Sequence, residues 1–229
     1  MRKILLKLSG ESLGKSGVDA KTLRRTVREI ASAAEKNSLA IVIGGGNIWR
    51  FRDKKSLRIA RVESDFLGMT ATVFNAVALK NALANLRIRA KVFSATKICD
   101  ELAEKYSASA ARKFLAKKGV ALLAGGTGKS GVTTDTAAAL RAVELGCDLV
   151  VKATNVAGIF DRDPRKSRKA KLLKEVCFAE VLTKNLGVMD RQAFEILGKK
   201  KIPIRVFNFA KTGLLKKAVA GENVGSLIF

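Results

Sequence analysis

Residues 3–11 read KILLKLSGE, in which a short apolar run with one lysine inside it, Lys7, leads into a glycine turn. Apolar runs of this length, rich in Val, Ile and Leu, are typical of strands buried on both faces of a parallel sheet. The run Ile4–Leu8 is therefore the first predicted strand. Five further runs have the same character: Ala40–Ile43, Ala90–Phe93, Val120–Leu123, Leu149–Val151 and Ile204–Phe207.

Segments with helical spacing separate these predicted strands. In Asp19–Asn37 apolar residues recur every three or four positions behind Asp19, whose side chain is suited to cap the helix. Six more segments predict helices: Asp65–Leu86, Ser107–Lys117, Thr134–Leu145, Phe178–Leu186, Asp190–Gly198 and Thr212–Ala220. Because strand and helix alternate nearly to the end, we predict an α/β fold with a mostly parallel sheet covered by helices on both sides.

The length and composition favour one compact domain, which we predict over residues 1–229. Of these residues 48% are hydrophobic and two are proline, enough for a sizeable core and no flexible linker. No run of eighteen apolar residues without charge occurs, and the N-terminus reads as a buried strand, so we expect no membrane span. The three cysteines, at wide spacings, predict neither a disulfide framework nor a zinc site and favour the cytoplasm.

Charge and histidine content narrow the chemistry. The 44 Lys and Arg residues against 20 Asp and Glu give a net charge of +24. Such a field attracts nucleotides, nucleic acid or an anionic membrane alike, or it reflects basic residues on solvated faces. Histidine is absent, which excludes His-based acid–base catalysis, Ser–His and Cys–His nucleophiles, and the commonest transition-metal ligand. The chemistry must therefore use Lys, Arg, Asp, Thr and backbone groups.

Three glycine turns follow predicted strands, at residues 7–11 (KLSGE), 44–47 (GGGN) and 125–128 (GGTG). Glycine lets backbone N–H groups approach a phosphate, and ligands of open α/β sheets bind beyond the carboxyl ends of the strands. A single turn of this kind is often only structural, but three in one chain favour a polyphosphate site. Residues 128–130 (GKS) imitate a Walker A loop, yet the glycine required five positions before Gly128 is Leu123. No dinucleotide-binding G-x-G-x-x-G is satisfied at Gly44–Gly46 either.

Phosphoryl transfer needs mainly in-line positioning and charge cancellation. The cations that we expect to supply it are Lys7, Arg50 and Lys152. Lys7 is the most suggestive, because a lysine inside an apolar strand must carry its charge to the strand end or into a site. Asp135 and Asp163 are candidates to organise the lysines or Mg²⁺. Asp65, at the start of a long predicted helix, is a candidate to bind a ribose.

Seven motifs occur in a fixed order along the chain: residues 7–11 (KLSGE), 44–50 (GGGNIWR), 133–135 (TTD), 152–160 (KATNVAGIF), 163–164 (DP), 188–190 (VMD) and 203–208 (PIRVFN). In order and spacing they resemble the bacterial-type uridylate (UMP) kinases of the amino-acid-kinase superfamily, and the likeness runs from Lys3 to Ile228. Carbamate, acetylglutamate and aspartate kinases share parts of the first and third glycine turns. The last two motifs are most like the UMP kinases.

The resemblance implies a three-layer α/β/α sandwich and phosphorylation of UMP to UDP by ATP, in pyrimidine nucleotide biosynthesis. It also implies Mg²⁺, no metal ligand from the protein, and a homohexamer. The implied catalytic residues are Lys7 and Asp135. The implied ATP-binding residues are Lys7, Leu8, Ser9, Gly10, Gly46, Arg50, Thr154, Phe160 and Asp163. The implied UMP-binding residues are Gly45, Asp65, Thr127, Gly128, Lys129, Ser130, Gly131, Val132, Thr133 and Thr134.

The sequence departs from this family in three places. Residues 129–132 (KSGV) fill the length where the family usually has Asn-Pro-Phe-Phe, which bears on acceptor specificity. The loop between Glu11 and Asp19 is short, and no histidine is available for a regulatory surface, which bears on activation by GTP. Residues 50–55 (RFRDKK) form a bulkier, more basic loop than is common near the donor phosphates.

Two alternatives stay open. The first is another small-molecule kinase of the same superfamily, acting on a carboxylate, carbamate or isoprenoid phosphate. The second is a nucleic-acid-binding role on the basic surface, for which interleaved aromatic and basic residues would be the signal. Trp49 and Phe51 are the one pair of this kind.

Overall fold

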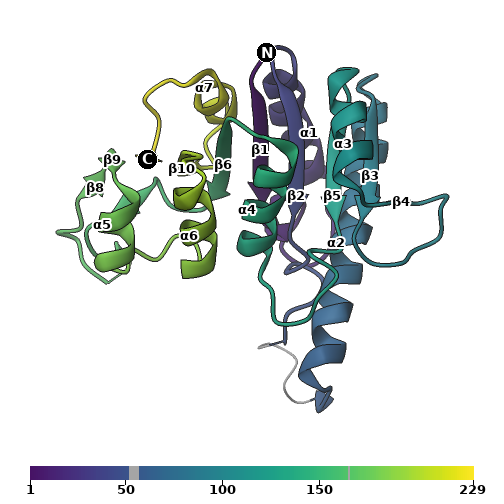
Figure 1. The fold of residues 1–229 in the computed structure, drawn as a ribbon, viewed down its shortest axis with the longest axis horizontal. Coiled ribbons are helices and arrows are strands. Elements are labelled where there is room, and N and C mark those ends of the chain that lie inside the picture. Colours follow the sequence, from purple (N-terminus) through teal and green to yellow (C-terminus); the bar gives the residue numbers. More distant parts are fainter. Residues whose placement is uncertain (52–56, 165) are drawn as a thin grey trace.

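The computed structural model describes residues 1–51, 57–164 and 166–229, and its centre is the sheet shown in Figure 1. All six predicted strands are present: β1 (Lys3–Leu8), β2 (Ser38–Ile43), β3 (Ala90–Ser94), β5 (Val120–Ala124), β6 (Leu149–Thr154) and β10 (Ile204–Asn208). The sheet has nine strands in the order β4-β3-β5-β2-β1-β6-β10-β11-β9, and every pairing is parallel except that of β10 with β11. The predicted mostly parallel α/β sheet is confirmed.

Short strands that have no predicted counterpart complete the structure. They are β4 (Glu104–Lys105), β7 (Ile159–Phe160), β8 (Leu172–Leu173), β9 (Glu175–Val176) and β11 (Ser226–Ile228). The pair β7 and β8 forms a separate antiparallel ribbon beside the main sheet. Strands of two or three residues are too short to show a hydrophobic period, so the sequence pattern could not reveal them.

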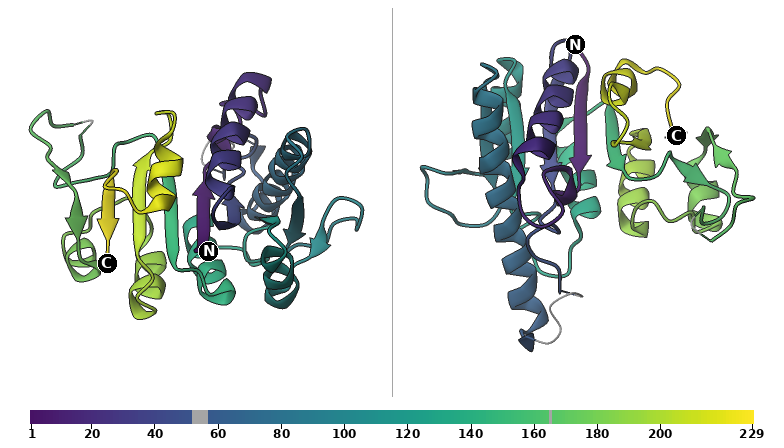
Figure 2. Two further views of the ribbon diagram at one scale, coloured as in Figure 1. Left: turned by 90° about the horizontal axis from the view of Figure 1, so that it is seen from above. Right: turned by 180° about the vertical axis from the view of Figure 1, so that it is seen from behind.

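The helices lie on both faces of the sheet, as Figure 2 shows from above and from behind. Their bounds are α1 (Ala20–Ala34), α2 (Arg61–Ala84), α3 (Ala108–Ala116), α4 (Thr134–Leu145), α5 (Phe178–Thr183), α6 (Arg191–Lys199) and α7 (Leu214–Ala220), with a 3₁₀ turn at Gly10–Ser12. One core holds Ile30 of α1, Leu79 of α2 and Leu215 of α7 against the sheet. The other core holds the inward residues of α3, α4, α5 and α6, such as Phe194. The fold is the predicted three-layer α/β/α sandwich.

The start of α2 differs from the prediction. The helix begins at Arg61, one turn before Asp65, because the Glu63 side chain accepts the backbone N–H of Ala60 at 3.1 Å and satisfies the helix start. Asp65 therefore lies in the second turn. The basic residues Arg52, Lys54 and Lys55 of the predicted donor-side loop lie outside the described residues.

By length and composition alone, α2 is long and apolar enough to cross a membrane, with 24 residues and a mean hydropathy of 1.2. Of its most apolar window 44% is buried inside the protein, and a core helix of a soluble protein passes the same test. One such helix is weak evidence for a membrane span. On its outward side α2 nevertheless leaves Val62, Phe66, Leu67 and Phe74 exposed by 41–59%.

Candidate active site

The site is centred on two lysines that lie side by side at the carboxyl ends of β1 and β6. Lys7 of β1 is the register partner of Lys152 of β6, and both strands are in the middle of the sheet. Asp135, in the first turn of α4, presents one carboxylate oxygen to each lysine. Its Oδ1 lies 2.9 Å from Lys7 Nζ, and its Oδ2 lies 2.5 Å from Lys152 Nζ. The prediction that Asp135 sets the geometry of the lysines agrees with these contacts.

Burial makes these charges strongly interdependent. The three side chains are only 13%, 17% and 8% exposed for Lys7, Asp135 and Lys152. Burial and the positive charge of Lys7 lower the pKa of Lys152 to about 8, although Asp135 opposes the shift. Burial alone would raise the pKa of Asp135, but the two lysine charges outweigh it and hold that pKa below its ordinary value. Near neutral pH the cluster therefore has two positive charges and one negative charge. Its net positive charge favours the binding of an anion.

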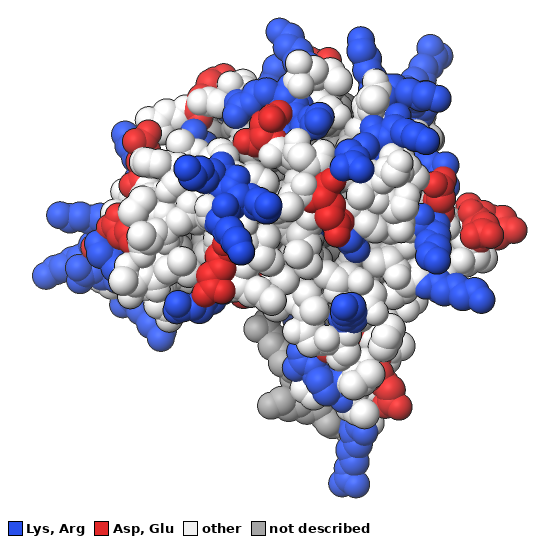
Figure 3. Space-filling model, viewed as in Figure 1, with Lys and Arg blue, Asp and Glu red and all other residues white. Residues whose placement is uncertain are grey.

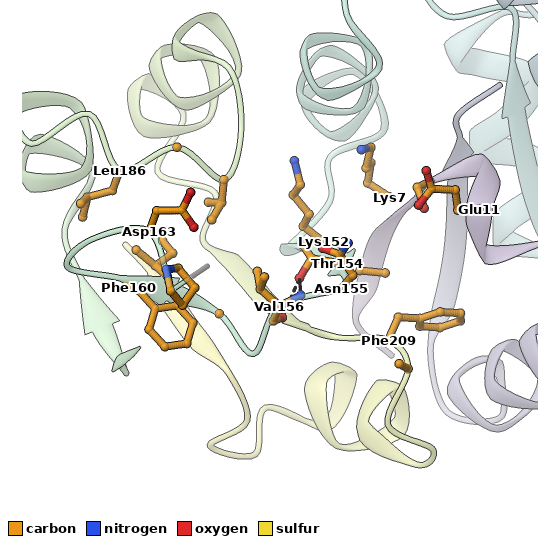
Figure 4. A pocket seen from close by; sticks show the side chains of 18 of the residues that line it. Lys7, Glu11, Lys152, Thr154, Asn155, Val156, Phe160, Asp163, Leu186 and Phe209 are labelled. Carbon is orange, nitrogen blue, oxygen red and sulfur yellow. Dashed lines mark hydrogen bonds between the residues drawn. The ribbon is translucent and has the colours of Figure 1, made fainter. Parts of the chain in front are cut away.

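A cavity of about 910 Å³ opens beside this cluster (Figure 4). Figure 4 shows the ammonium groups of Lys7 and Lys152 pointing the same way, with Phe160 and Leu186 at one end of the cavity and Glu11 and Phe209 at the other. Of the predicted ATP-binding residues, the cavity wall includes Lys7, Ser9, Thr154, Phe160 and Asp163. The volume is in the range of sites that enclose a small ligand.

The first two glycine turns are held together by buried amides. Asn75 of α2 donates to the Gly44 carbonyl at 2.8 Å and to Asn47 Oδ1 at 2.7 Å, and Asn47 donates to the Gly17 carbonyl at 2.8 Å. Gly10 lies directly against this pair, because a Cβ at that position would come within 2.1 Å of Asn47 Oδ1. The close approach of the turns at residues 7–11 and 44–47 therefore requires glycine at position 10.

Two predicted ATP-binding residues have their side chains away from the cavity wall. Arg50 pairs with Glu11 at 2.5 Å, so the carboxylate ties this arginine to the first glycine turn. The side chain of Leu8 is completely buried in the core, so only the backbone of Leu8 is available to a ligand. Glu11 also lines the cavity. It belongs to the first glycine motif but was not among the predicted site residues.

The predicted UMP-binding loop is brought to Asp65. The Ser130 hydroxyl and the Gly131 N–H each donate to Asp65 Oδ2 at 2.8 Å, while Arg61 holds the other oxygen at 2.9 Å. These bonds outweigh the effect of burial and lower the pKa of Asp65. Although Asp65 is not the first residue of α2, the structure brings its carboxylate into contact with Ser130 and Gly131 of the predicted UMP-binding loop.

Two residues outside the predicted set fix the ends of this loop. Arg141 of α4 is buried, and its guanidinium donates to the Gly126 carbonyl at 3.0 Å and pairs with Glu144 at 2.8 Å. Asp190, which caps α6, accepts from the Thr133 hydroxyl and from the Thr136 hydroxyl at 2.8 Å. An arginine among the apolar residues of the predicted helix 134–145 is the local signal for Arg141, but its contact with Gly126 could not be deduced from the sequence.

No group of three or more His, Cys, Asp or Glu side chains suited to a metal ion occurs in the described part of the chain. The carboxylate at the centre, Asp135, already contacts two lysines. Mg²⁺ commonly binds through substrate phosphates and water rather than through a protein cage. This donor set therefore fits a metal that is carried on a nucleotide, and the cavity wall includes the carboxylates of Glu11, Asp161 and Asp163.

Comparison with known proteins gives consistent matches over the whole chain. The profile of the Amino acid kinase family matches residues 2–208. Curated relatives include the uridylate kinases of Xanthomonas oryzae pv. oryzae and Xanthomonas euvesicatoria pv. vesicatoria, each 40% identical over 99% of this chain and 96% of the relative. Similar solved structures are a UMP kinase from Bacillus anthracis (TM-score 0.95, 31% identity, 99% of this chain and 95% of that one) and a UMP kinase from Ureaplasma parvum (TM-score 0.94, 33% identity, 99% and 98%).

Proposed function

The chain belongs to the amino acid kinase family, and from that premise we propose that it is a nucleoside monophosphate kinase that transfers the terminal phosphoryl group of ATP to UMP. The observation that carries the proposal is the Lys7–Asp135–Lys152 cluster between a large cavity and a glycine loop. Two anionic nucleotides that meet end to end need cations at the point where they meet. The uridylate kinases and UMP kinase structures that this chain resembles support the choice of UMP.

The large cavity is the proposed ATP site. Its apolar part, with Phe160, Val156 and Leu186, suits a purine ring, and the two lysines lie between Phe160 and Glu11 (Figure 4). Phosphates placed there lie against Lys7, Ser9 and Gly10. Lys7 and Lys152 then cancel the charge that develops on the transferred phosphoryl group, and Asp135 fixes the position of both ammonium groups.

The acceptor is proposed to lie across the cluster, on the turn at Gly45 and the loop at residues 127–134. Asp65 has its carboxylate next to this loop and is proposed to bind the ribose. The loop residues Lys129 and Ser130 surround the acceptor phosphate. Mg²⁺ bound to the ATP phosphates would neutralise part of their charge; the described residues form no group of three or more His, Cys, Asp or Glu side chains that could hold the ion.

An assay of ADP release tests the function. The protein is supplied with ATP and Mg²⁺ and, in turn, UMP, CMP, dUMP, carbamate and N-acetylglutamate. UMP should give the highest kcat/KM. Failure of UMP together with activity on any other acceptor would reject the proposed acceptor while keeping the kinase, and omission of Mg²⁺ should abolish turnover.

We also propose a homohexamer in the cytoplasm. The exposed apolar residues Val62, Phe66 and Phe74 are spaced four or eight apart on α2, so they share one face of the helix. An apolar stripe of this kind is common where proteins associate. Sedimentation velocity of the wild type and of a Phe66→Ser/Phe74→Ser variant checks the oligomeric state: the hexamer should dominate in the wild type and dissociate in the variant.

The proposed cytoplasmic location rests on the cysteines. The described cysteines are all unpaired, in keeping with a reducing compartment.

The nucleic-acid alternative gains no support from the visible surface. Figure 3 shows Lys and Arg spread over this face among acidic and neutral residues, without a single continuous basic track among the coloured residues. Proteins that bind single strands usually combine such a track with stacked aromatic residues. The high positive charge therefore does not by itself assign a nucleic-acid partner.

A further inference from the structure

A second cavity, of about 460 Å³, lies between the first half of α1 and the segment that leads into α7. Figure 2, in the view from behind, shows α1 in front on the face that Figure 1 hides. The wall is formed by Lys21, Thr22, Arg24, Arg25, Arg28, Glu29 and Thr212. We call this the α1 basic cavity. It has four cationic side chains and one carboxylate.

The one carboxylate is already engaged in holding the fold together. Glu29 is 6% exposed and accepts the Gly213 N–H at 2.8 Å, which joins α1 to the start of α7. Over 1–51, 57–164 and 166–229, no ion pair reaches Lys21, Arg24, Arg25 or Arg28. Glu29 on the wall and Asp19, whose charge interacts with that of Lys21, offset part of the positive charge of this cavity and leave it net positive.

The placement of these cations is unfavourable for the helix itself. Lys21 and Arg25 are four residues apart on α1, as are Arg24 and Arg28, so like charges face each other in two pairs. Like charges at this spacing destabilise a helix. Basic residues that serve only solubility do not need to be placed four residues apart on one helix. An anion bound between the paired cations would attract both of them and offset their mutual repulsion.

Arg25 connects this cavity with the proposed ATP site. Its guanidinium donates to the carbonyls of Phe209 at 2.9 Å and Ala210 at 3.1 Å, and it lies 5.1 Å from the centre of the Phe209 ring. Arg25, Phe209 and Ala210 also line the large cavity. One arginine thus forms a wall that the two cavities share.

We propose that the α1 basic cavity binds an oligophosphate anion, a chain of two or more phosphate groups, at a site separate from both substrates. The volume suits a compact ligand, and four cations on one cavity wall suit a ligand with three or more negative charges. A concave site of this size favours a small polyanion over a nucleic-acid backbone. Since occupancy draws Arg25 away from Phe209 and Ala210, the bound anion weakens ATP binding.

Calorimetric titration with inorganic triphosphate at low ionic strength tests the site. Lys7→Ala protein serves as the starting point, because its ATP site is impaired and the α1 basic cavity is intact. We expect one binding event per chain, and the Arg24→Ala/Arg28→Ala exchange in the same background should raise Kd at least tenfold. The matched control, Lys113→Ala/Lys117→Ala, removes two exposed cations four residues apart on and beside α3 and should change Kd by less than twofold.

The outcomes are distinct. Equal loss of binding in both double variants would show a general charge effect and overturn the proposal, as would no binding in Lys7→Ala protein. Tighter binding of a single-stranded oligonucleotide than of triphosphate, abolished by the same two arginine exchanges, would replace it with a nucleic-acid site. Equal affinity for inorganic triphosphate and for a nucleoside triphosphate would show that the site recognises the phosphate chain alone. Higher affinity for the nucleoside triphosphate would show that the site also contacts the nucleoside.

Folding failure does not obscure this test. The Arg24→Ala/Arg28→Ala exchange removes a like-charge pair from α1, so its melting temperature should not fall below that of the parent. In the wild-type enzyme, inorganic triphosphate should raise KM for ATP. In an enzyme that carries only the Arg24→Ala/Arg28→Ala exchange, this rise in KM should be at least threefold smaller. Assay of UMP turnover remains separate, because neither arginine belongs to the proposed substrate sites.

Discussion

Replacing Asp135 by Asn removes the carboxylate that separates the two site lysines. Two unit charges about 4 Å apart in a site with an effective dielectric constant of about 20 interact by about 4 kcal/mol. Loss of the attraction between Asp135 and Lys152 lowers the pKa of Lys152 further below about 8. If the side chains around it do not rearrange, an attraction of this size corresponds to a fall of up to about three pH units. The variant should therefore lose the Lys152 charge over the whole physiological range of pH.

The pH dependence of kcat/KM for ATP measures this effect. A group with a pKa of about 8 is about three-quarters protonated at pH 7.5, and each unit of fall in pKa lowers the protonated fraction up to about tenfold. Raising the pH removes the proton, so the ratio of wild-type to Asp135→Asn activity should grow from pH 6 to pH 8.5 by about tenfold or more. The matched control, Glu195→Gln, removes an exposed carboxylate paired with Arg191 and should leave the ratio flat. A ratio for Asp135→Asn that stays constant across this range would refute the reasoning.

Four other substitutions test separate parts of the protein. Lys7→Ala should lower kcat by about 10²–10³-fold, as expected for loss of a group that stabilises the transition state, while circular dichroism shows an unchanged fold. Arg141→Met frees the Gly126 carbonyl and should raise KM for UMP about tenfold in steady-state assays, with little change in KM for ATP. Gly10→Ala should destabilise the protein by more than about 1 kcal/mol in urea unfolding, because the new Cβ has no space. Gly68→Ala, in α2 with 3.9 Å to its nearest neighbour, should instead stabilise it by up to about 1 kcal/mol.

The ends of helices show what the sequence can and cannot reveal. Helix α4 matches its predicted bounds, Thr134–Leu145, because Thr133 caps its start and Gly146, with φ of 63°, ends it. Both are residue types that favour these positions in any sequence. The start of α2 was placed late, because Ala60 gives no capping signal and the Glu63 side chain acts in its place.

The same distinction holds in the site. Lys7 was predictable because a charged residue in an apolar strand is a local anomaly that only a site or a strand end resolves. Asn75 and Arg141 were not predicted, since each acts on a glycine turn in a distant part of the chain. Local pattern identifies the groups that touch a ligand better than the groups that hold them in place, because the second depends on tertiary contacts.

This distinction bears on the acceptor loop, where the sequence departs from the family. Residues 129–132 differ from the usual pattern, yet the backbone of the loop is held from outside. Asp65 accepts the Gly131 N–H at 2.8 Å, Arg141 donates to the Gly126 carbonyl at 3.0 Å, and Thr133 donates to Asp190. A loop whose frame is fixed by its neighbours can exchange side chains without moving its N–H groups. The exchange at residues 129–132 therefore alters side chains more than the course of the backbone, so we expect phosphoryl transfer to tolerate it.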